Sequence, residues 1–565
     1  MASKLTLTLP LILLMSLGCA GAPRFPLRPP LLEDDDQRAH AHEPEEYYSP
    51  FAWDGANYMI FHPIARFFAV DPAGAAVNVN AWDEVPNSSW FEGRLGARPM
   101  TAQQVAQGSC SNEVLDPNGA DGSWTIDQGK ANGANPGFRV NIKGLGKFML
   151  KTDPESEPDR ATGATAIASR IYHAAGYYAP CDTVVYFKPS LLKLAPGLTS
   201  TDNQGVTRPF DQPALDRVLS TASHRNGLVR MVASSWLPGK PLGPFRYEGT
   251  RDDDPNDVIP HEDRREVRAG RLLAAWLNHF DSREQNSMDV FMRAEGKKDG
   301  PGYVRHYLLD FGDCFGSRWA QDGISRRLGT SYVFDAGHIA EDFLTLGAIE
   351  RPWERARLTG GIFNYFSARD FDPETWRGEY PNPAFMRMTE QDGAWMARIL
   401  ANFGDELVTA AVKVGQYEPA AERYLIDTLL RRRDAILKRY LSRVSPIARV
   451  VVNQRGVCAV DLARLTRTVP NEALSFRAYL YRGADLEPTE NKARFLPVAP
   501  PGVCVNIAHR DFPPNLPLDS AERYVVLDIT NGYAPGPLRL HLYDLGPQGY
   551  RIAGIERPLE LKPPG

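Results

Sequence analysis

One stretch of the chain, residues 276–317, constrains the fold most strongly because two short polar motifs flank a hairpin pattern in it. The first motif runs from Asp281 to Asn286, just after a pattern that predicts the end of a helix. The second motif, Asp310-Phe311-Gly312, follows the strand-like residues 303–309. A turn-rich segment separates these residues from the preceding apolar run, which is typical of a β-hairpin. Such a hairpin would return Asp310 to the side of Asn286.

Carboxylate and amide oxygens that converge at one point are ligands that Mg²⁺ prefers, and Mg²⁺ commonly completes its shell with water and phosphate. We therefore expect Asn286 and Asp310 to bind Mg²⁺, and Asp281 to face a hydroxyl acceptor. This layout resembles the protein-kinase-like fold. It resembles atypical members most, such as HipA-type, phosphatidylinositol-kinase and CotH-like kinases, because Phe280 replaces the arginine of the usual His-Arg-Asp motif. The alternative is that Asp281 and Asp310 are ordinary turn residues.

Residues 111–240 have the pattern of a β-rich N-lobe in a kinase of this kind. Strand-like runs at 123–127 and 138–142 are followed by a third run that ends at Lys151. The resemblance implies that Lys151 contacts the phosphates of ATP and takes part in catalysis. The alternative is a lysine on an edge strand.

A glycine-rich turn, residues 129–137, separates the first two of these strands. Gly129, Gly133 and Gly137 would allow backbone N–H groups to approach phosphate, so the turn is a candidate nucleotide-binding loop. A plain hairpin loop is the alternative.

The predicted helix over residues 161–175 departs from the kinase pattern. Kinase-like proteins carry a glutamate there that pairs with the strand lysine, but Thr165 occupies the matching position. Glu155 and Glu157 precede the helix. Either one of them reaches Lys151 from the loop, or this ion pair is absent.

Residues 241–445 are expected to form a helical C-lobe, entered through a hinge at Leu237-Pro238-Gly239. The apolar spacing predicts an amphipathic helix over residues 263–278, directly before the Asp281 loop. Later helices are predicted at 395–403, 405–414 and 418–444. The arginine run at 431–433 is expected to be solvated.

Residues 446–565 change in character, with seven β-rich runs separated by proline and glycine. This spacing predicts a β-sandwich. Cys458 and Cys504 fall on two of the expected strands, and we predict a disulfide between them. The runs are 448–453, 457–462, 475–481, 503–507, 524–529, 538–543 and 550–555.

The N-terminus has the features of a targeting segment over residues 1–19. A lysine precedes an apolar run too short to span a bilayer, and the segment ends in Ser16-Leu17-Gly18-Cys19. This resembles a bacterial lipoprotein signal with Cys19 as the lipidated residue; an ordinary secretory signal is the alternative. Residues 20–46, rich in proline and charge, are expected to be a disordered tether, followed by an N-terminal extension over 47–110.

Length and charge restrict the class of protein. A chain of 565 residues is too long for one core, and its net charge of −5 argues against nucleic acid as a partner. The expected fold class is α+β: a two-lobed kinase-like domain followed by a C-terminal β-sandwich. The expected function is Mg²⁺- and ATP-dependent phosphotransfer by an exported protein, lipid-anchored in the bacterial envelope, to an envelope protein or small-molecule acceptor. A catalytically inactive envelope lipoprotein, acting as a pseudokinase scaffold or binding protein, is the alternative.

Overall fold

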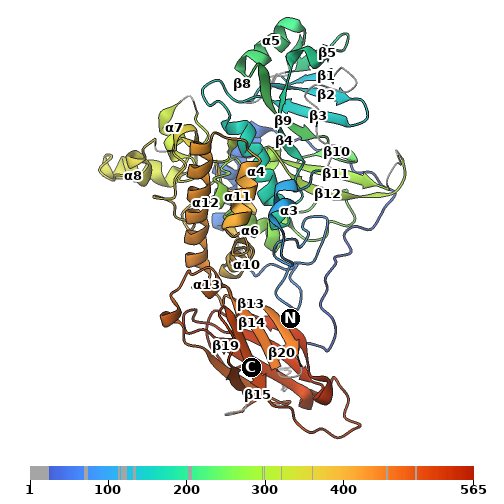
Figure 1. The fold of residues 1–565 in the computed structure, drawn as a ribbon, viewed down its shortest axis with the longest axis vertical. Coiled ribbons are helices and arrows are strands. Elements are labelled where there is room, and N and C mark those ends of the chain that lie inside the picture. The colour runs from blue at the N-terminus through green and yellow to red at the C-terminus, as the bar shows by residue number, and fades with distance from the viewer. Residues whose placement is uncertain are drawn as a thin grey trace, which may run out of the picture.

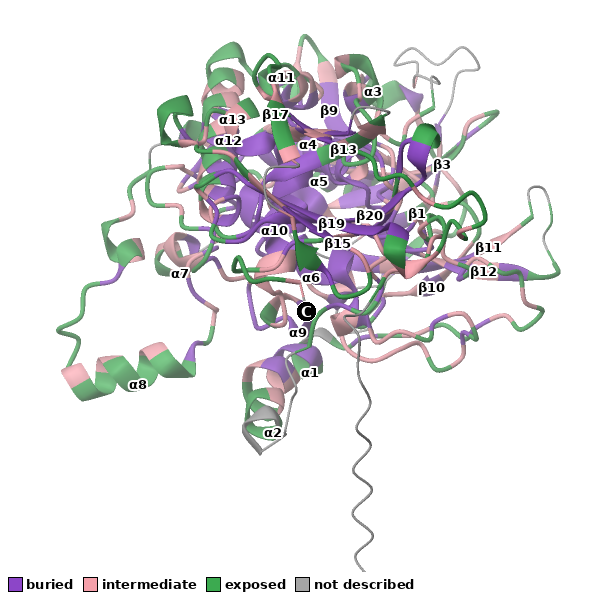
Figure 2. Cartoon of the chain, turned by 90° about the horizontal axis from the view of Figure 1, so that it is seen from below, coloured by how far each residue is buried: buried purple, intermediate pink, exposed green. Residues whose placement is uncertain are grey.

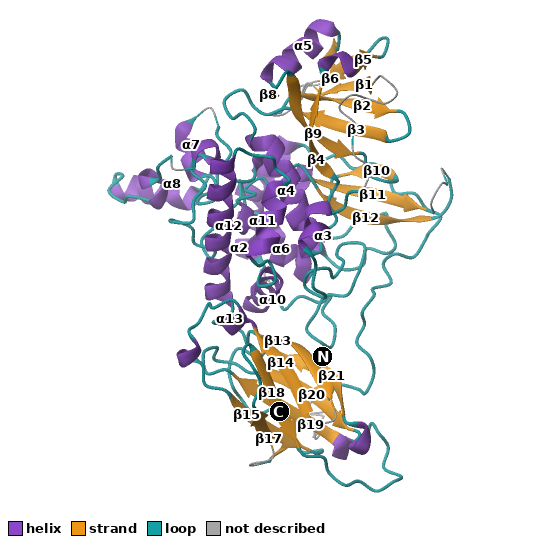
Figure 3. Cartoon of the chain, viewed as in Figure 1, coloured by secondary structure: helices purple, strands orange, loops and turns teal. Residues whose placement is uncertain are grey.

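The computed structural model describes most of the chain after its N-terminal segment. The described residues are 24–68, 74–111, 115, 124–130, 135–201, 206–294, 297, 299–319, 321–358, 360–453, 456–489 and 493–564. The targeting segment with Cys19, and Gly133 of the glycine-rich turn, lie outside them. The described part is a mixed α+β structure with several sheets, in which strands occupy the two ends and helices fill the middle (Figure 3).

The first sheet is built from residues 124–235 and has the strand order β4-β9-β3-β2-β1-β5, with β8 paired to β9. A second, two-stranded sheet of β6 (Thr199–Thr201) and β7 (Thr207–Pro209) lies beside it. The strands of the first sheet are β1 (Trp124–Lys130), β2 (Gly137–Ile142), β3 (Gly146–Lys151), β4 (Asp182–Phe187), β5 (Leu192–Leu194), β8 (His224–Arg225) and β9 (Leu228–Ser235).

The two faces of this sheet pack against different parts of the chain, because side chains alternate along each strand. Phe138 and Leu150 belong to a buried apolar cluster on one face, together with residues of α5 (Gln212–Thr221). Lys151, the next residue after Leu150, points to the opposite face. Helix α4 (Arg160–Ala175) lies on that opposite face, where Arg230 of β9 donates a hydrogen bond to Thr162.

The middle of the molecule is helical, and its apolar cluster includes Trp276, Trp395, Leu425 and Leu437. The helices around this cluster are α3 (Ala102–Gln107), α4, α6 (Arg265–Leu277), α9 (Pro383–Met386), α10 (Glu390–Leu400), α11 (Asp405–Lys413) and α12 (Pro419–Tyr440). Helices α1 (Phe51–Ala56), α2 (His62–Phe68), α7 (Asp322–Arg327) and α8 (Ala336–Thr345) lie at the periphery, where Figure 2 shows many exposed residues.

A three-stranded sheet flanks these helices and forms the hairpin predicted from the sequence. Strand β10 (Lys240–Gly243) pairs with β11 (Ser287–Arg293), which pairs with β12 (Gly302–Leu308). Because Ser287 is paired with Leu308, the residues just before β11 lie next to those just after β12. The hairpin therefore places the Asp281–Asn286 loop beside Asp310.

The C-terminal part consists of two antiparallel sheets that share one apolar cluster, with Val505 and Leu527 from different sheets inside it. All seven predicted runs overlap strands, whereas β16 and β17 were not predicted. A short helix, α13 (Leu462–Leu465), follows β14. One sheet holds β13 (Ile447–Asn453), β14 (Gly456–Asp461), β17 (Ala493–Leu496) and β18 (Gly502–Ile507); the other holds β15 (Arg477–Arg482), β16 (Glu487–Pro488), β19 (Tyr524–Thr530), β20 (Leu538–Asp544) and β21 (Tyr550–Glu556).

Residues 24–46 differ from the disordered tether that their composition predicts. They run from the C-terminal sheets along the outside of β10–β12 (Figure 1). The Phe25 amide donates to the Tyr524 hydroxyl, and His40 and Gly302 exchange two backbone hydrogen bonds. Asp36 is buried and accepts hydrogen bonds from Ser89. The segment has no core of its own, but long-range polar contacts order it, and composition does not reveal such contacts.

Two disulfides lie among the described residues. One joins Cys458 and Cys504, which face each other on β14 and β18. The other joins Cys110 to Cys181 and was not predicted, because Cys110 lies in a loop without a strand pattern. Cys314 is the one free cysteine in this part of the chain, and it is buried.

We expect replacement of both Cys458 and Cys504 by serine to lower the free energy of unfolding of the C-terminal part. The bridge closes a loop with a sequence separation of 46, for which the chain-entropy relation gives about 4 kcal/mol. Denaturant unfolding of the oxidised protein measures the loss.

A peptide map without reduction should show both linked pairs, with the Cys314 thiol alkylated only after denaturation. Alkylation of Cys458 or Cys504 in the native, unreduced protein would contradict the assignment.

Candidate functional site

The loop that carries Asp281 is fixed at its start by the end of α6. Asn278 ends the helix in the left-handed region at φ 51°, and its side-chain oxygen accepts a hydrogen bond from Trp376. Arg432 of α12 donates to the carbonyls of Ala275 and Trp276 at 2.6 and 2.9 Å. Arg432 is therefore buried and not solvated as its sequence context suggests. It satisfies carbonyl groups that a helix end leaves without partners.

Asp281 is buried, and Arg283 lies 2.6 Å from its carboxylate. Arg283 also pairs with Glu379. Burial raises the pKa of Asp281 well above its usual range, with the nearby Glu379 adding to the effect and Arg283 opposing it. The loop therefore presents an oriented carboxyl group with an increased affinity for a proton.

Asn286 follows five residues later in a short 3₁₀ turn, Glu284–Asn286. Its side-chain N–H₂ group donates to the Asp281 carbonyl at 2.7 Å, which leaves the amide oxygen to face other partners. The Asn286 carbonyl accepts from the amide of Leu309 at 3.1 Å. The backbone therefore ties Asn286 to the residue that directly precedes Asp310.

Glu284, between these two residues, is held from outside by the N-terminal segment. Its carboxylate accepts hydrogen bonds from Ser49 at 2.9 Å, Tyr58 at 3.3 Å and Tyr47 at 3.4 Å. Burial raises the pKa of Glu284 to about 7. No pattern in residues 47–58 indicates that they support this loop.

Asp310 meets Lys151 across the boundary between the first sheet and the helical part. The Lys151 ammonium lies 2.8 Å from the Asp310 carboxylate, and the two side chains are 14% and 39% exposed. Burial acts to raise the pKa of Asp310, but Lys151 and Lys130 hold it below its usual range. Asp310 has φ 60°, a conformation that is uncommon outside glycine and often marks a functional position.

Lys130, at the end of β1, is a second cation at this site that sequence reasoning missed. Its ammonium donates to the Asn135 carbonyl at 3.3 Å, across residues 131–134. Burial and the charge of Lys151 lower the pKa of Lys130 to about 8, while Asp310 and Asp313 oppose them. Its position directly after Gly129, within the predicted glycine-rich turn, was the available signal.

Packing accounts for both of the described candidate glycines. A Cβ atom at Gly137 would lie 2.1 Å from the Leu150 carbonyl oxygen, and one at Gly129 would lie 2.4 Å from the Phe210 ring. Both residues lie within strands, so the turn itself is confined to the residues between β1 and β2. Nothing in their contacts requires a nucleotide to explain them.

The glutamate missing from α4 is not replaced by either upstream glutamate. Glu157 is paired with Arg160 at 3.0 Å and accepts from Asn364, while Glu155 is exposed. Thr165 donates to the Ala161 carbonyl in its own helix. Of the two outcomes left open by the sequence, the structure has the second: the pair between Lys151 and a helix or upstream glutamate is absent.

Arg160, the first residue of α4, instead links this helix to the Asp310 motif. Its guanidinium donates to the carbonyls of Gly312 at 2.8 Å and Cys314 at 3.1 Å. Tyr172 of the same helix stacks on Phe311 with ring centroids 4.7 Å apart. Both ends of α4 therefore hold the short turn after Asp310 in place.

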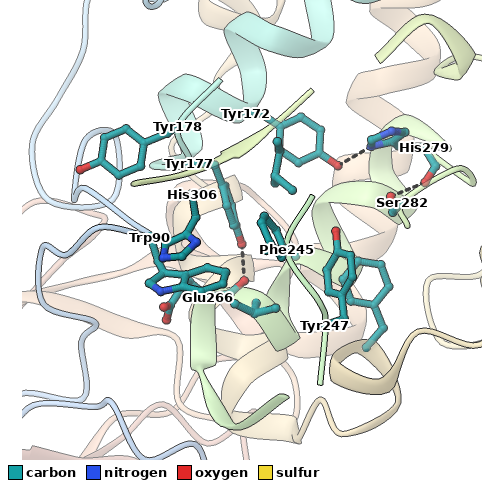
Figure 4. Close-up of a pocket in the computed structure, with 14 residues that line it drawn as sticks. Trp90, Tyr172, Tyr177, Tyr178, Phe245, Tyr247, Glu266, His279, Ser282 and His306 are labelled. Atoms are coloured by element: carbon teal, nitrogen blue, oxygen red, sulfur yellow. Dashed lines mark hydrogen bonds between the residues drawn. The ribbon is translucent and has the colours of Figure 1, made fainter. Parts of the chain in front are cut away.

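Behind the loop lies a small, mainly aromatic cavity of about 30 Å³ (Figure 4). The Tyr172 hydroxyl and the His279 ring form a hydrogen bond of 3.0 Å across one side of it. Trp90, Phe245 and Tyr247 line the rest of its wall. A volume of this size suits about one water molecule. The cavity therefore supports the loop and does not provide room for a nucleotide.

Asp182, at the start of β4, is a further buried acid near the site. It is 1% exposed, and the Ser234 hydroxyl of the neighbouring strand β9 is the hydrogen-bond donor that acts on it. Burial raises the pKa of Asp182 to about 7, against this hydrogen bond and the charges of Arg170 and Lys151. Its sequence context, a single acid before an apolar strand, does not reveal this burial.

Comparison with family models, curated proteins and solved structures finds no match for this chain. Among the residues that the structure describes, no three His, Cys, Asp or Glu side chains form a metal-binding group. In the same residues no helix has the length and apolar character needed to cross a bilayer.

Asp182→Asn should stabilise the protein at pH 8 and have little effect at pH 4. The pKa of Asp182 is about 7 in the folded chain and 3.8 as a model value, so the folded state binds the proton more tightly. Wild-type stability is therefore lost as the pH rises from about 4 to 7, and the loss is constant above that range. A shift of about three pKa units corresponds to at most roughly 4 kcal/mol. Denaturant unfolding at the two pH values measures it.

An equal effect of Asp182→Asn at both pH values would contradict this prediction. Asp427→Asn, which changes an exposed carboxylate on α12, is the control and should leave the pH dependence unchanged.

Proposed function

We propose that this chain is a kinase-like protein that binds a Mg²⁺–nucleotide between the first sheet and the helical part and transfers phosphate to a hydroxyl acceptor. The observation that carries the proposal is the Lys151–Asp310 pair at 2.8 Å, formed by residues 159 positions apart. It brings the last residue of β3 to the residue after the β11–β12 hairpin. The kinase resemblance predicts that these two residues share one site.

The arrangement of elements supports the finer fold proposal. The first sheet and α4 would be the N-lobe, and the helices around α6 and α12 would be the C-lobe, with the β10–β12 hairpin at the junction. The two C-terminal sheets, which share an apolar cluster, would form a β-sandwich.

The residues present fit a magnesium ion. Asp310 is partly exposed, and Asn286 uses its amide nitrogen internally, so its oxygen remains as a ligand. With no cluster of three acidic, histidine or cysteine ligands in the described part, the protein would supply two oxygens. Water and phosphate would supply the rest, which is the usual environment of Mg²⁺.

Each residue then has a separate task. Lys151 and Lys130 provide two positive charges opposite the phosphates. Asp281, with its raised pKa and its ion pair to Arg283, would orient the acceptor hydroxyl and accept its proton. The bound Mg²⁺–nucleotide would supply the phosphoryl group and neutralise part of its charge. The acceptor would be an envelope protein or a small molecule, and nucleic acid is not expected.

A second function, a scaffold without catalysis, is favoured by one observation. The helix glutamate that orients the strand lysine in kinases is replaced by Thr165, and Glu157 is committed to Arg160. Such a protein would keep the fold and bind a partner in the envelope.

A nucleotide should raise Tm only when Mg²⁺ or Mn²⁺ is present. At a nucleotide concentration 100 times Kd, ligand linkage gives about 2.7 kcal/mol, which corresponds to a rise of several degrees. Asp310→Asn should abolish the shift because it removes a charged ligand. Asp281→Asn should keep the shift and stop transfer, because this residue faces the acceptor. Thermal unfolding measures the first effect, and the formation of nucleoside diphosphate in the presence of candidate hydroxyl acceptors measures the second.

Asp427→Asn is the control and should behave as the wild type in both assays. A cation-dependent shift with no transfer in any condition would favour the scaffold. No shift at all, or a shift unaffected by Asp310→Asn, would contradict the proposed site.

We also propose that the protein is exported and lipid-anchored through Cys19, as the first 19 residues suggest. Cys19→Ala should move the mature protein from the membrane fraction to the soluble envelope fraction, since one acylated residue would be the anchor. Fractionation followed by immunoblotting measures this. If Cys19→Ala protein stays on the membrane, lipidation is not what holds it there.

A further inference from the structure

Asp182 and Lys151 lie on the same face of the first sheet, separated by one strand. Asp182 is paired with Ser234 of β9, which is paired in turn with Met149 of β3. Directly paired residues point to the same face, and so do residues two apart on one strand. Lys151 is two residues after Met149. On β9, between the two strands, Ser234 lies beside Asp182 and Val232 lies beside Lys151, so the carboxylate and the lysine are diagonal neighbours across this strand.

The surroundings of Asp182 contain one mobile cation and one fixed cation. The fixed one is Arg170 of α4, whose guanidinium donates to the carbonyl of Ala106 at 2.8 Å. The mobile one is Lys151, whose chain of four methylene groups can turn about the end of β3. Asp310 is the remaining charged group that acts on Asp182. One neutral hydroxyl, that of Ser234, does not compensate a buried carboxylate fully, so its charge is costly unless a cation can reach it.

A metal ion bound to Asp310 competes with Lys151 for the carboxylate oxygens. An ammonium group and a divalent cation on one carboxylate repel each other, and the Lys151 side chain, only 14% exposed, needs another negative charge nearby. Phosphate supplies one on the nucleotide side. Asp182 is the buried carboxylate on the protein side, and its charge already favours the charged form of Lys151.

We propose that Asp182 is a positioning residue for Lys151. When Asp310 binds its metal ion, the Lys151 ammonium moves from the Asp310 carboxylate to that of Asp182. Asp182 then orients the lysine as the helix glutamate does in kinases, at whose position this chain has Thr165. The inference deepens the proposed function and rests on it for the role of the metal. The exchange between the two carboxylates is a property of the protein alone.

The first experiment therefore uses no nucleotide. In the wild type at pH 8, Asp182→Asn removes a buried charge that forms no ion pair among the described residues, and it should raise Tm. In an Asp310→Asn background, Asp182 becomes the carboxylate that holds Lys151, so adding Asp182→Asn should lower Tm. The double-mutant cycle thus tests whether the Tm effect of Asp182→Asn changes sign between the two backgrounds. A purely structural role of Asp182 would give an effect of the same sign in both.

Asp153→Asn is the matched control. Asp153 is also a buried carboxylate near α4, but it accepts hydrogen bonds from the amide and hydroxyl of Thr162. Asp153→Asn should therefore lower Tm by a similar amount in the wild-type and Asp310→Asn backgrounds. Asp182→Glu, which keeps the charge, should behave like the wild type in the Asp310→Asn background. The same sign for Asp182→Asn in both backgrounds would overturn the inference.

A structure of the Asp310→Asn variant gives a second measurement if a double variant does not fold. The Lys151 ammonium should lie within hydrogen-bond distance of the Asp182 carboxylate. A lysine that still points to residue 310, with Asp182 unpaired, would overturn the proposal.

The nucleotide experiment separates this inference from the proposed function. If the wild type binds a Mg²⁺–nucleotide, Asp182→Asn should weaken binding about 3- to 10-fold, with no further loss in a Lys151→Met background. If the wild type does not bind, the proposed function fails, while the change of sign still decides whether Asp182 and Asp310 share Lys151.

Discussion

The Lys151–Asp310 ion pair is the interaction on which the organisation of this molecule depends. It joins a strand of the first sheet to the turn after a distant hairpin, and the Lys151 side chain is largely enclosed while that of Asp310 is partly exposed. Removal of Asp310 would leave the enclosed Lys151 ammonium without its partner, which is more costly than the pair itself is stabilising. The contacts of Arg160 and Tyr172 with the residues that follow Asp310 have the same effect from the side of α4. The Lys151–Asp310 pair and these contacts of α4 thus hold the first sheet against the helical part.

The loop beside this pair is supported from three parts of the chain that are far apart in sequence. Arg432 holds the end of α6, Glu379 contacts Arg283, and the N-terminal segment donates hydrogen bonds to Glu284. Most of these supports are charged or hydroxyl groups rather than apolar side chains. A polar loop built in this way is rigid only while every partner is present, because each buried group left without a hydrogen bond is costly.

Local patterns were sufficient to predict the longer elements around the site but not the contacts between them. The helix before Asp281, the hairpin before Asp310 and the C-terminal strands have regular apolar spacing, so the sequence indicates them directly. The pairing of Cys458 with Cys504 followed from their positions on two strands. Asp182 and Glu284 gave no comparable signal, since what distinguishes them is burial against other parts of the chain, Ser234 for the first and Ser49 for the second. The N-terminal segment was misjudged for the same reason: its composition is that of a linker, and its order comes from Tyr524, Gly302 and Ser89.

The docking of Phe25 has a consequence for how the chain folds. Its amide partner, the Tyr524 hydroxyl, lies 499 residues later. Phe25 can therefore dock only once β19 and β20 exist. Contacts of such long separation form late, since the intervening loop must be closed first. The same segment continues to Ser49, whose hydroxyl bonds Glu284 235 residues later and needs no part of the last sheet. The newly made protein can thus complete the support of Glu284 before the start of this segment docks on the C-terminal part.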